Sequence, residues 1–186
     1  AIDRLDYSND GANSVARSFL SLSRYYMASM GTADYGWNIG GTGPASNTTV
    51  IDRLIFSSDT TTAASRANAT SVYGNAGVGN LTYGWSGGGL QTPGTVSTVE
   101  RYTYANDTTN TSARGPLSAI RNSHTSSSNP YYGWFLSGGS PSGSSVERID
   151  FANDLAGATV RGPILNSIYS GAGTGNDNFA WVAGGN

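Results

Sequence analysis

The chain contains neither cysteine nor lysine, and it has a single histidine, His124. Without cysteine it can form no disulfide and no thiolate metal site. One histidine without further ligands is too little for a zinc site, and a Ser-His-Asp triad would need partners built around that one residue. The sequence therefore predicts no metal, no cofactor and no catalytic residue.

Long apolar segments and helical patterns are also missing. No apolar run approaches the roughly 20 residues that a membrane helix needs, so we expect no membrane insertion. The net charge is −2, all ten basic residues are arginine, and no basic face is evident, which argues against a nucleic-acid partner. The length of 186 residues suits one domain, which we place at 1–186.

What the sequence does contain is a fourfold repeat. Arginines recur at intervals of 49, 48 and 47 residues, at Arg4, Arg53, Arg101 and Arg148. The same intervals separate Asp10, Asp59, Asp107 and Asp154, and also Arg17, Arg66, Arg114 and Arg161. Tryptophans lie 48, 49 and 47 residues apart, at Trp37, Trp85, Trp134 and Trp181. These markers divide the chain into units at approximately 1–49, 50–97, 98–145 and 146–186.

Each unit has the pattern of short strands. The stretch TVIDRLIF at 49–56 alternates and carries apolar side chains on both faces, as expected for a sheet packed between two neighbours. The turn residues SND, SSD or AND follow this strand, and an aromatic strand such as YGWNI ends at a double glycine. About four strands in a unit of about 48 residues match the size of a propeller blade. The sequence thus predicts an all-β fold.

The order of these features resembles the kelch repeat. An arginine, an aromatic strand, a double glycine and an acidic strand follow one another at Arg24, 35–41 and 50–54, and again at Arg121, 132–139 and 146–151. The resemblance implies a kelch-like β-propeller with four blades. The chain departs from the pattern where Trp precedes the glycines, and where Tyr73 and Ile168 replace the arginine.

The style of the repeat also resembles that of structural and tail-fibre proteins of marine bacteriophages, notably cyanophages. This second resemblance implies a virion or extracellular location.

The two ends of the chain bear on ring closure. The first unit begins in the middle of a blade, and the fourth stops before the corresponding strand. The N-terminal strand is therefore expected to complete the last blade and hide an exposed sheet edge. Two alternatives stay open: an end pairs with another chain, or the repeats belong to a longer array.

Repeated residues are interpreted as structural. We expect the aspartates to cap turns, the tryptophans to pack between blades, and the first set of arginines to pair with acids between blades. The second set, beginning with Arg17, could instead gather on one face and meet anions. DYSNDG at 6–11 resembles the start of a calcium loop, but Arg17 replaces the acid expected at its end, so we interpret it as a turn.

Binding residues are expected among side chains that are not repeated, because function concentrates in variable loops. The unrepeated aromatic candidates are Tyr25, Tyr26, Tyr73, Tyr131 and Tyr169. The loops at 40–49, 88–98 and 138–145 differ in sequence and should lie together at one end of the ring.

These features favour a binding or structural module that is not an enzyme. Its expected partner is a surface glycan or a virion protein. One alternative is an architectural protein that assembles into a homo-oligomer. Another is a propeller-type enzyme acting on glycans, for which the unrepeated Asp34 and Asp177 would have to share one pocket.

Overall fold

Short antiparallel strands joined by tight turns build the structure, a computed structural model that describes residues 1–139 and 143–185. Three sheets have four strands each, in the order of the chain or its reverse. The first sheet contains β3 (Ala28–Gly31), β4 (Tyr35–Ile39), β5 (Val50–Ile55) and β6 (Ala64–Asn68). The second contains β7 (Ala76–Gly79), β8 (Tyr83–Gly87), β9 (Val99–Thr103) and β10 (Ser112–Arg114). The third contains β11 (Thr125–Ser128), β12 (Tyr132–Leu136), β13 (Val146–Asp150) and β14 (Thr159–Arg161).

Each end of the chain contributes a two-stranded sheet. The N-terminal half-sheet pairs β1 (Ile2–Arg4) with β2 (Val15–Ser18), and the C-terminal half-sheet pairs β15 (Ala172–Gly175) with β16 (Ala180–Ala183). By their place in the repeat, β15 and β16 match the first two strands of a complete sheet, whereas β1 and β2 match the last two. The all-β prediction is confirmed, and the four-stranded antiparallel sheets are compatible with a propeller-like fold.

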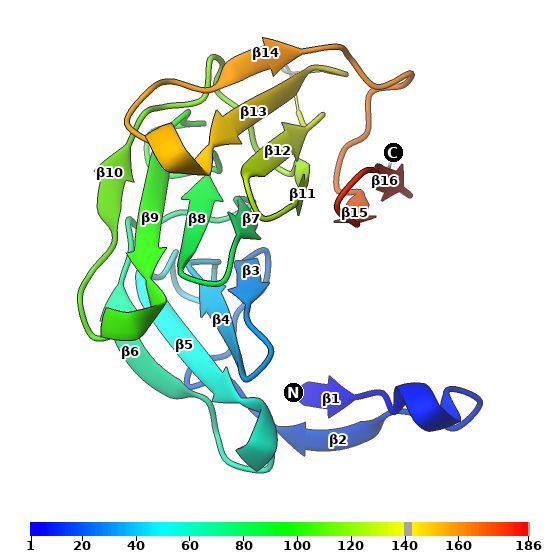
Figure 1. Ribbon diagram of the computed structural model, residues 1–186. Helices are drawn as coiled ribbons and strands as arrows, with labels where there is room; N and C mark the ends of the chain where they lie inside the picture. The colour runs from blue at the N-terminus through cyan, green and yellow to red at the C-terminus, as the bar shows by residue number, and fades with distance from the viewer. Residues whose placement is uncertain (140–142, 186) are drawn as a thin grey trace.

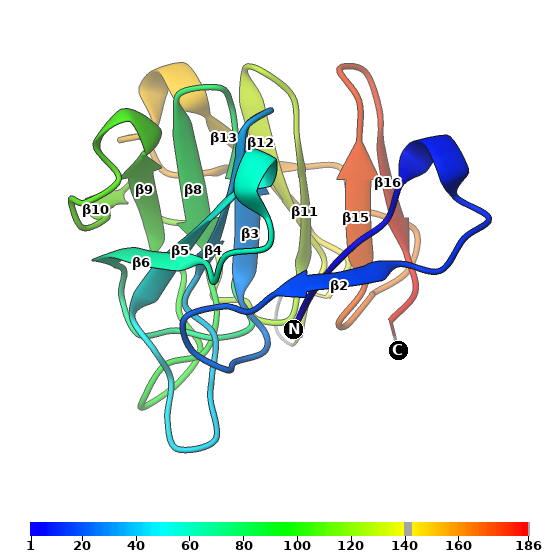
Figure 2. The same cartoon turned by 90° about the horizontal axis from the view of Figure 1, so that it is seen from below.

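The sheets lie side by side along an open arc (Figure 1). Strands β3, β7, β11 and β15 follow its inner side, and the two half-sheets lie at its ends. Figure 2 shows that the turns after β1, β5, β9 and β13 gather at one end of the sheets, while the long loops extend from the other. No helix in the described ranges is both long and apolar enough to cross a membrane.

Small residues let the inner strands approach one another closely. A Cβ added to Gly77 of β7 would lie 2.6 Å from the carbonyl oxygen of Ser29 in β3. On the other side of β7, the Ser126 hydroxyl donates to the Gly77 carbonyl at 2.7 Å. At Gly77 the inner strands of neighbouring sheets therefore approach too closely for a side chain, and a serine hydroxyl bonds to the exposed backbone.

The tryptophans pack between sheets where a following sheet is complete. Trp37 stacks on Tyr104 of the second sheet, and Trp85 stacks on Phe151 of the third, each with ring centroids 4.1 Å apart. Both indoles are buried. Trp37 and Trp85 thus each pack between two neighbouring sheets.

Each repeated aspartate from the second unit onward binds two arginines of the preceding unit. Arg4 and Arg17 contact Asp59 at 3.0 and 2.8 Å. Arg53 and Arg66 contact Asp107 at 2.6 and 2.8 Å, and Arg101 and Arg114 contact Asp154 at 3.1 and 3.0 Å. We call these sets the Arg–Arg–Asp clusters.

The clusters correct two expectations. The aspartates follow short 3-10 turns such as η2 (Phe56–Ser58), as expected, but their carboxylates join sheets rather than cap turns. The second set of arginines does not form an anion site in the first three units, because Arg17, Arg66 and Arg114 are bound to aspartate. The hydrogen bond from Arg17 lowers the pKa of Asp59, so this carboxylate stays charged.

The double glycine also serves contact between sheets. Gly40 and Gly41 have positive φ angles of 67° and 96°, and the Gly41 N–H donates to the carbonyl of Val72 in the next unit at 2.8 Å. A Cβ on Gly40 would lie 2.6 Å from that same carbonyl oxygen. In the third unit the pair with positive φ is Ser137–Gly138, one residue before the two glycines that the sequence pattern suggested.

Ring closure is not seen in the described residues. There, β1 pairs with β2 alone and β16 pairs with β15 alone, so the two half-sheets do not join. A closed ring of four blades stays a prediction.

Candidate functional site

The loop end of the arc holds one exposed aromatic cluster. The segment before each inner strand contains one residue in the left-handed region, and these residues are Tyr26, Gly74, Ser123 and Ser170. Their backbones form a chain of hydrogen bonds along the arc. Gly74 N–H donates to Tyr26, Ser123 N–H to Gly74, and Ser170 N–H to Ser123, each at 2.8 Å. The backbone that carries this aromatic cluster is therefore held in place by hydrogen bonds between neighbouring units.

Three of the predicted tyrosines meet there. Tyr25 and Tyr26 form an edge-to-face pair with ring centroids 5.1 Å apart, and Tyr26 lies 6.5 Å from Tyr73. Tyr25 is 54% exposed and Tyr26 is 58% exposed, while Tyr73 is half-buried. We call this set the tyrosine cluster. It presents aromatic faces with hydroxyl tips to solvent, which suits both an apolar sugar face and a protein surface.

Backbone hydrogen bonds attach the tyrosine cluster to two of the variable loops. Tyr25 exchanges hydrogen bonds with Thr42 at 3.0 and 2.9 Å, and Tyr73 does so with Leu90 at 3.0 and 2.7 Å. The same loops line a shallow polar hollow with Asn47, Thr70, Ser71, Gln91 and Thr92 along it. The loops at 40–49 and 88–98 thus lie at one end of the arc, whereas 140–142 of the third loop fall outside the described residues.

The other two tyrosines lie elsewhere. Tyr169 is two units away along the arc, with its ring against Gly139. Tyr131 is 70% exposed on the β11–β12 turn, at the opposite end of the sheets. The five candidates therefore do not form one site.

The repeat assignment of these tyrosines was wrong. With the left-handed residues aligned, Tyr25, Tyr73 and Tyr169 occupy one equivalent position, which Asn122 fills in the third unit. They are repeated in three units of four. The same alignment places Val72, not Tyr73, at the position of Arg24.

Two buried ion pairs support this end of the arc from beneath. Arg24 contacts Asp52 at 2.9 Å, and Arg121 contacts Glu147, with all four side chains buried. Arg24 also donates to the Asn38 carbonyl at 3.1 Å. Each of these charges is neutralised by its partner in the same sheet and is buried, so it is not accessible to a ligand.

The side chains that could have carried catalysis are not assembled. His124 is buried beside Phe135, with ring centroids 5.7 Å apart. Burial, together with the positive charge of Arg121, lowers the pKa of His124 to about 3. The ring is therefore neutral at ordinary pH.

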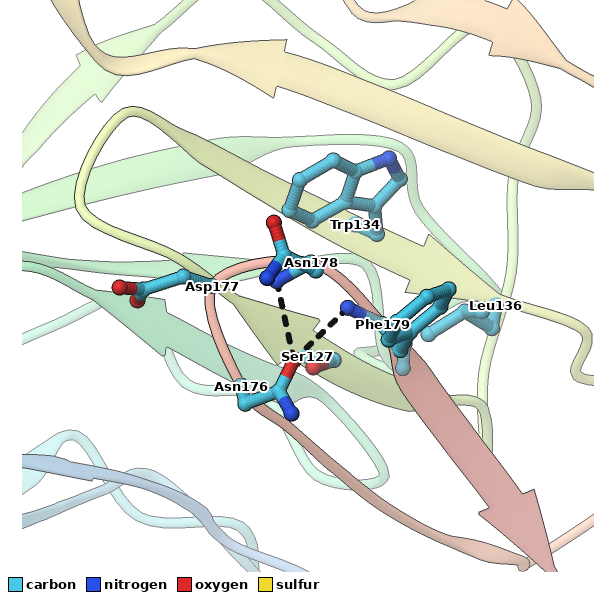
Figure 3. Close-up of a pocket in the computed structure, with 8 residues that line it drawn as sticks. Ser127, Trp134, Leu136, Asn176, Asp177, Asn178 and Phe179 are labelled. Carbon is cyan, nitrogen blue, oxygen red and sulfur yellow. Dashed lines mark hydrogen bonds between the residues drawn. The ribbon is translucent and has the colours of Figure 1, made fainter.

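The two unrepeated carboxylates lie on turns of different sheets. Asp34 is on the β3–β4 turn, and Asp177 is on the β15–β16 turn. Asp177 borders a hollow between the third sheet and the C-terminal half-sheet, shown in Figure 3, and the described lining of this hollow contains no second carboxylate. The enzyme alternative therefore lacks its paired acids at this hollow.

The proposed calcium-like segment forms a turn. Asp6 accepts hydrogen bonds from the backbone N–H and the hydroxyl of Ser8, at 2.9 and 2.6 Å. Across the described ranges, no group of three or more acidic, histidine or cysteine side chains converges.

Sequence reasoning missed how the tyrosine cluster forms, because it depends on the left-handed conformation of Tyr26, which no residue preference signals. It also missed that the repeated arginines and aspartates bind across successive units. The constant offset between the two sets, about one unit, was a usable signal for that contact.

Comparison with known proteins shows the fold alone. No family model matches the chain, and no curated protein matches it by sequence. The chain is similar in structure to YjhT, with a TM-score of 0.72 and 10% sequence identity. The match covers 87% of this chain and 59% of the length of YjhT.

Proposed function

We propose that the chain is a kelch-like β-propeller module that binds a partner without catalysis and presents the tyrosine cluster to it. The four units would supply four blades, whose sheets fix the loop end. The partner is a surface glycan or a protein, and the location is a virion or the outside of a cell. The location is supported by the resemblance of the sequence repeat alone.

The observation that carries the proposal is the exposure of Tyr25 and Tyr26 on rigid backbone. Large aromatic side chains that remain exposed while held by hydrogen-bonded backbone lose little conformational entropy when they bind. Tyr26 also occupies the left-handed region, at φ 57°, a conformation that costs free energy for a residue other than glycine.

The test is binding of a labelled chain to a panel of surface glycans. Because the chain has no cysteine, an Ala105→Cys variant provides one labelling position, on the exposed turn at the end opposite the tyrosine cluster. We expect saturable binding to one class of glycan. Tyr26→Ala should weaken it by about tenfold or more, as is typical for an aromatic contact at the centre of an interface.

Tyr131→Ala is the matched control, since it removes an equally exposed tyrosine from the other end of the sheets. Equal losses in the two variants would contradict the tyrosine cluster as the site. A folded protein that binds no glycan on the panel would remove glycan as the partner and leave a protein.

A further inference from the structure

Neighbouring sheets within the arc are joined by arginines from one sheet and an aspartate from the next. At the two ends of the arc, the arginines and the aspartate of one further such contact are left without each other. Along the arc, the N-terminal half-sheet and the first and second sheets each give two arginines to the sheet that follows, and the first and second sheets also give a tryptophan. The following sheet gives an aspartate in return, and an aromatic ring where it receives a tryptophan. Three junctions have both the arginines and the aspartate. The remaining arginines (the donor half) and the remaining aspartate (the acceptor half) lie at opposite ends of the chain.

The C-terminal end carries the donor half. In the described part of the chain, neither Arg148 nor Arg161 has a carboxylate partner, although Arg148 lies over the Tyr132 ring at 4.1 Å. Among the described residues, Trp134 has no stacked ring such as Trp37 and Trp85 have, and its aromatic neighbour is the Tyr132 ring, with centroids 5.9 Å apart. Its free face borders the hollow in Figure 3, which is the space that a ring equivalent to Phe151 would fill.

The N-terminal end carries the acceptor half. Asp10, the equivalent of Asp59, is exposed and has no cation partner in the described ranges. Tyr7, the equivalent of Phe151, is 90% exposed. A second hollow separates the N-terminal half-sheet from the first sheet and is lined by Ile2, Met30, Trp37 and Phe56, among others. It occupies the place that two inner strands would take.

The C-terminal half-sheet has exposed strands and aromatic side chains that could fill that second hollow. All four residues of β15 are exposed, whereas β7 and β11 each bury two of theirs. Trp181 in β16 is 54% exposed, and Phe179 beside it is 67% exposed. Exposed aromatic residues on an unpaired edge strand mark an interaction surface.

We propose that the C-terminal end of one copy docks on the N-terminal end of a second copy of this chain. Strand β16 would pair with β1 of the second copy, with Trp181 opposite Arg4, as Trp37 lies opposite Arg53 within the first sheet. Arg148 and Arg161 would bind Asp10 of the second copy, and Trp134 would stack on its Tyr7. The two half-sheets thereby become one four-stranded sheet.

A second copy fits the arc better than the chain's own other end. Arg4 and Arg17 already hold the N-terminal half-sheet against Asp59 of the second unit, and Figure 1 shows the two half-sheets separated. The gap between the half-sheets is thus present with the N-terminal half-sheet in its bonded position, and a second copy can fill it.

The first test is the mass of the untagged chain in solution, measured by sedimentation equilibrium over a wide range of concentration. A mass that rises from monomer to dimer or beyond supports the proposal. A monomer at every concentration overturns it.

Charge reversal then tests the junction itself. Asp10→Arg and Arg161→Asp should each raise the dissociation constant by at least about thirtyfold, while an equimolar mixture of the two variants should recover association. The mixture recovers because each junction again unites opposite charges. Thr109→Arg, which adds a positive charge to an exposed turn of the second sheet, away from both ends, should leave association unchanged.

Intramolecular closure gives a different result. It would keep the wild type monomeric, and Asp10→Arg would then lower the melting temperature of that monomer. Association that survives both single reversals would also overturn the proposed junction. The experiment does not depend on the tyrosine cluster, so its outcome is separate from that of the glycan panel.

Discussion

At the scale of single residues, the aspartate of each Arg–Arg–Asp cluster has the more demanding environment. The Asp107 side chain is 7% exposed, whereas Arg53 and Arg66 keep 21% and 28% exposure. Water therefore still hydrates the surplus positive charge, while the carboxylate depends on its two partners. Removing the carboxylate should cost more than removing either arginine.

We predict that Asp107→Asn lowers the free energy of unfolding by about 2 kcal/mol or more, because two guanidinium groups lose their charged acceptor at a junction between sheets. Urea unfolding of the monomer measures this loss. Asp10→Asn is the matched control, since it changes the equivalent residue where no arginine is bound, and it should leave the monomer unchanged. Equal losses in the two variants would contradict the assigned role of the cluster.

His124 makes stability depend on pH. Burial lowers its pKa to about 3 in the folded chain, so the unfolded chain takes up a proton that the folded chain refuses once the pH falls below about 6.5. Stability should therefore fall by about 2 kcal/mol between pH 7 and pH 5.

The control for this pH effect is His124→Asn, which introduces the residue found at the equivalent position in the second unit, Asn75. Thermal unfolding across that pH range should be flatter for the variant than for the wild type. Parallel curves would show that His124 is not the group that titrates.

At the scale of elements, the double glycine explains why the aromatic strand ends where it does. Two successive left-handed residues turn the chain out of the sheet and direct an N–H toward the next unit, as Gly41 does toward Val72. Ser137 shows that the first position tolerates a side chain where its hydroxyl is bonded, here to the carbonyls of Gly143 and Ile168 at 2.8 Å. The conformation, rather than glycine itself, is the repeated feature.

Gly40→Ala should destabilise the monomer by about 2 kcal/mol or more, because the new Cβ adds a steric contact with the Val72 carbonyl to an unfavourable φ angle. Chemical denaturation of the variant and the wild type provides the comparison. Gly94→Ala, in an open turn with no atom within 4 Å of the new Cβ, should change stability by no more than about 0.5 kcal/mol. A tolerated Gly40→Ala would show that the junction can shift.

The sequence predicted strands better than the contacts between them. Alternating apolar residues in β5 and the repeated tryptophans identified the strands correctly, because such local patterns reflect burial directly. Which carboxylate binds Arg53 could not be read locally, since Asp52 is adjacent in sequence but faces Arg24, whereas Asp107 is one unit away. The tyrosine cluster was predicted as candidate residues but not as a cluster, because its assembly depends on a backbone conformation.

At the scale of the whole molecule, protection of backbone amides from hydrogen exchange should be uneven along the arc. The second sheet, which contains β7, β8 and β9, lies between the first and third sheets, while each half-sheet lies at an end of the arc with a neighbouring sheet on one side. In a dilute sample, amide hydrogen exchange should be slowest in β8 and fastest in β15 and β16. At high concentration, β1 and β16 should gain protection together if copies associate, and gain in only one of them would argue against their pairing.

The Arg–Arg–Asp contacts all run in one direction along the chain. The first three units give their arginines forward and the last three give their aspartate backward, so each of the four units carries the residues for both parts of this joint. Duplication of one whole unit in the gene should therefore reproduce this ion-pair joint without a new kind of contact. We expect the length of such a protein to change in steps of one unit.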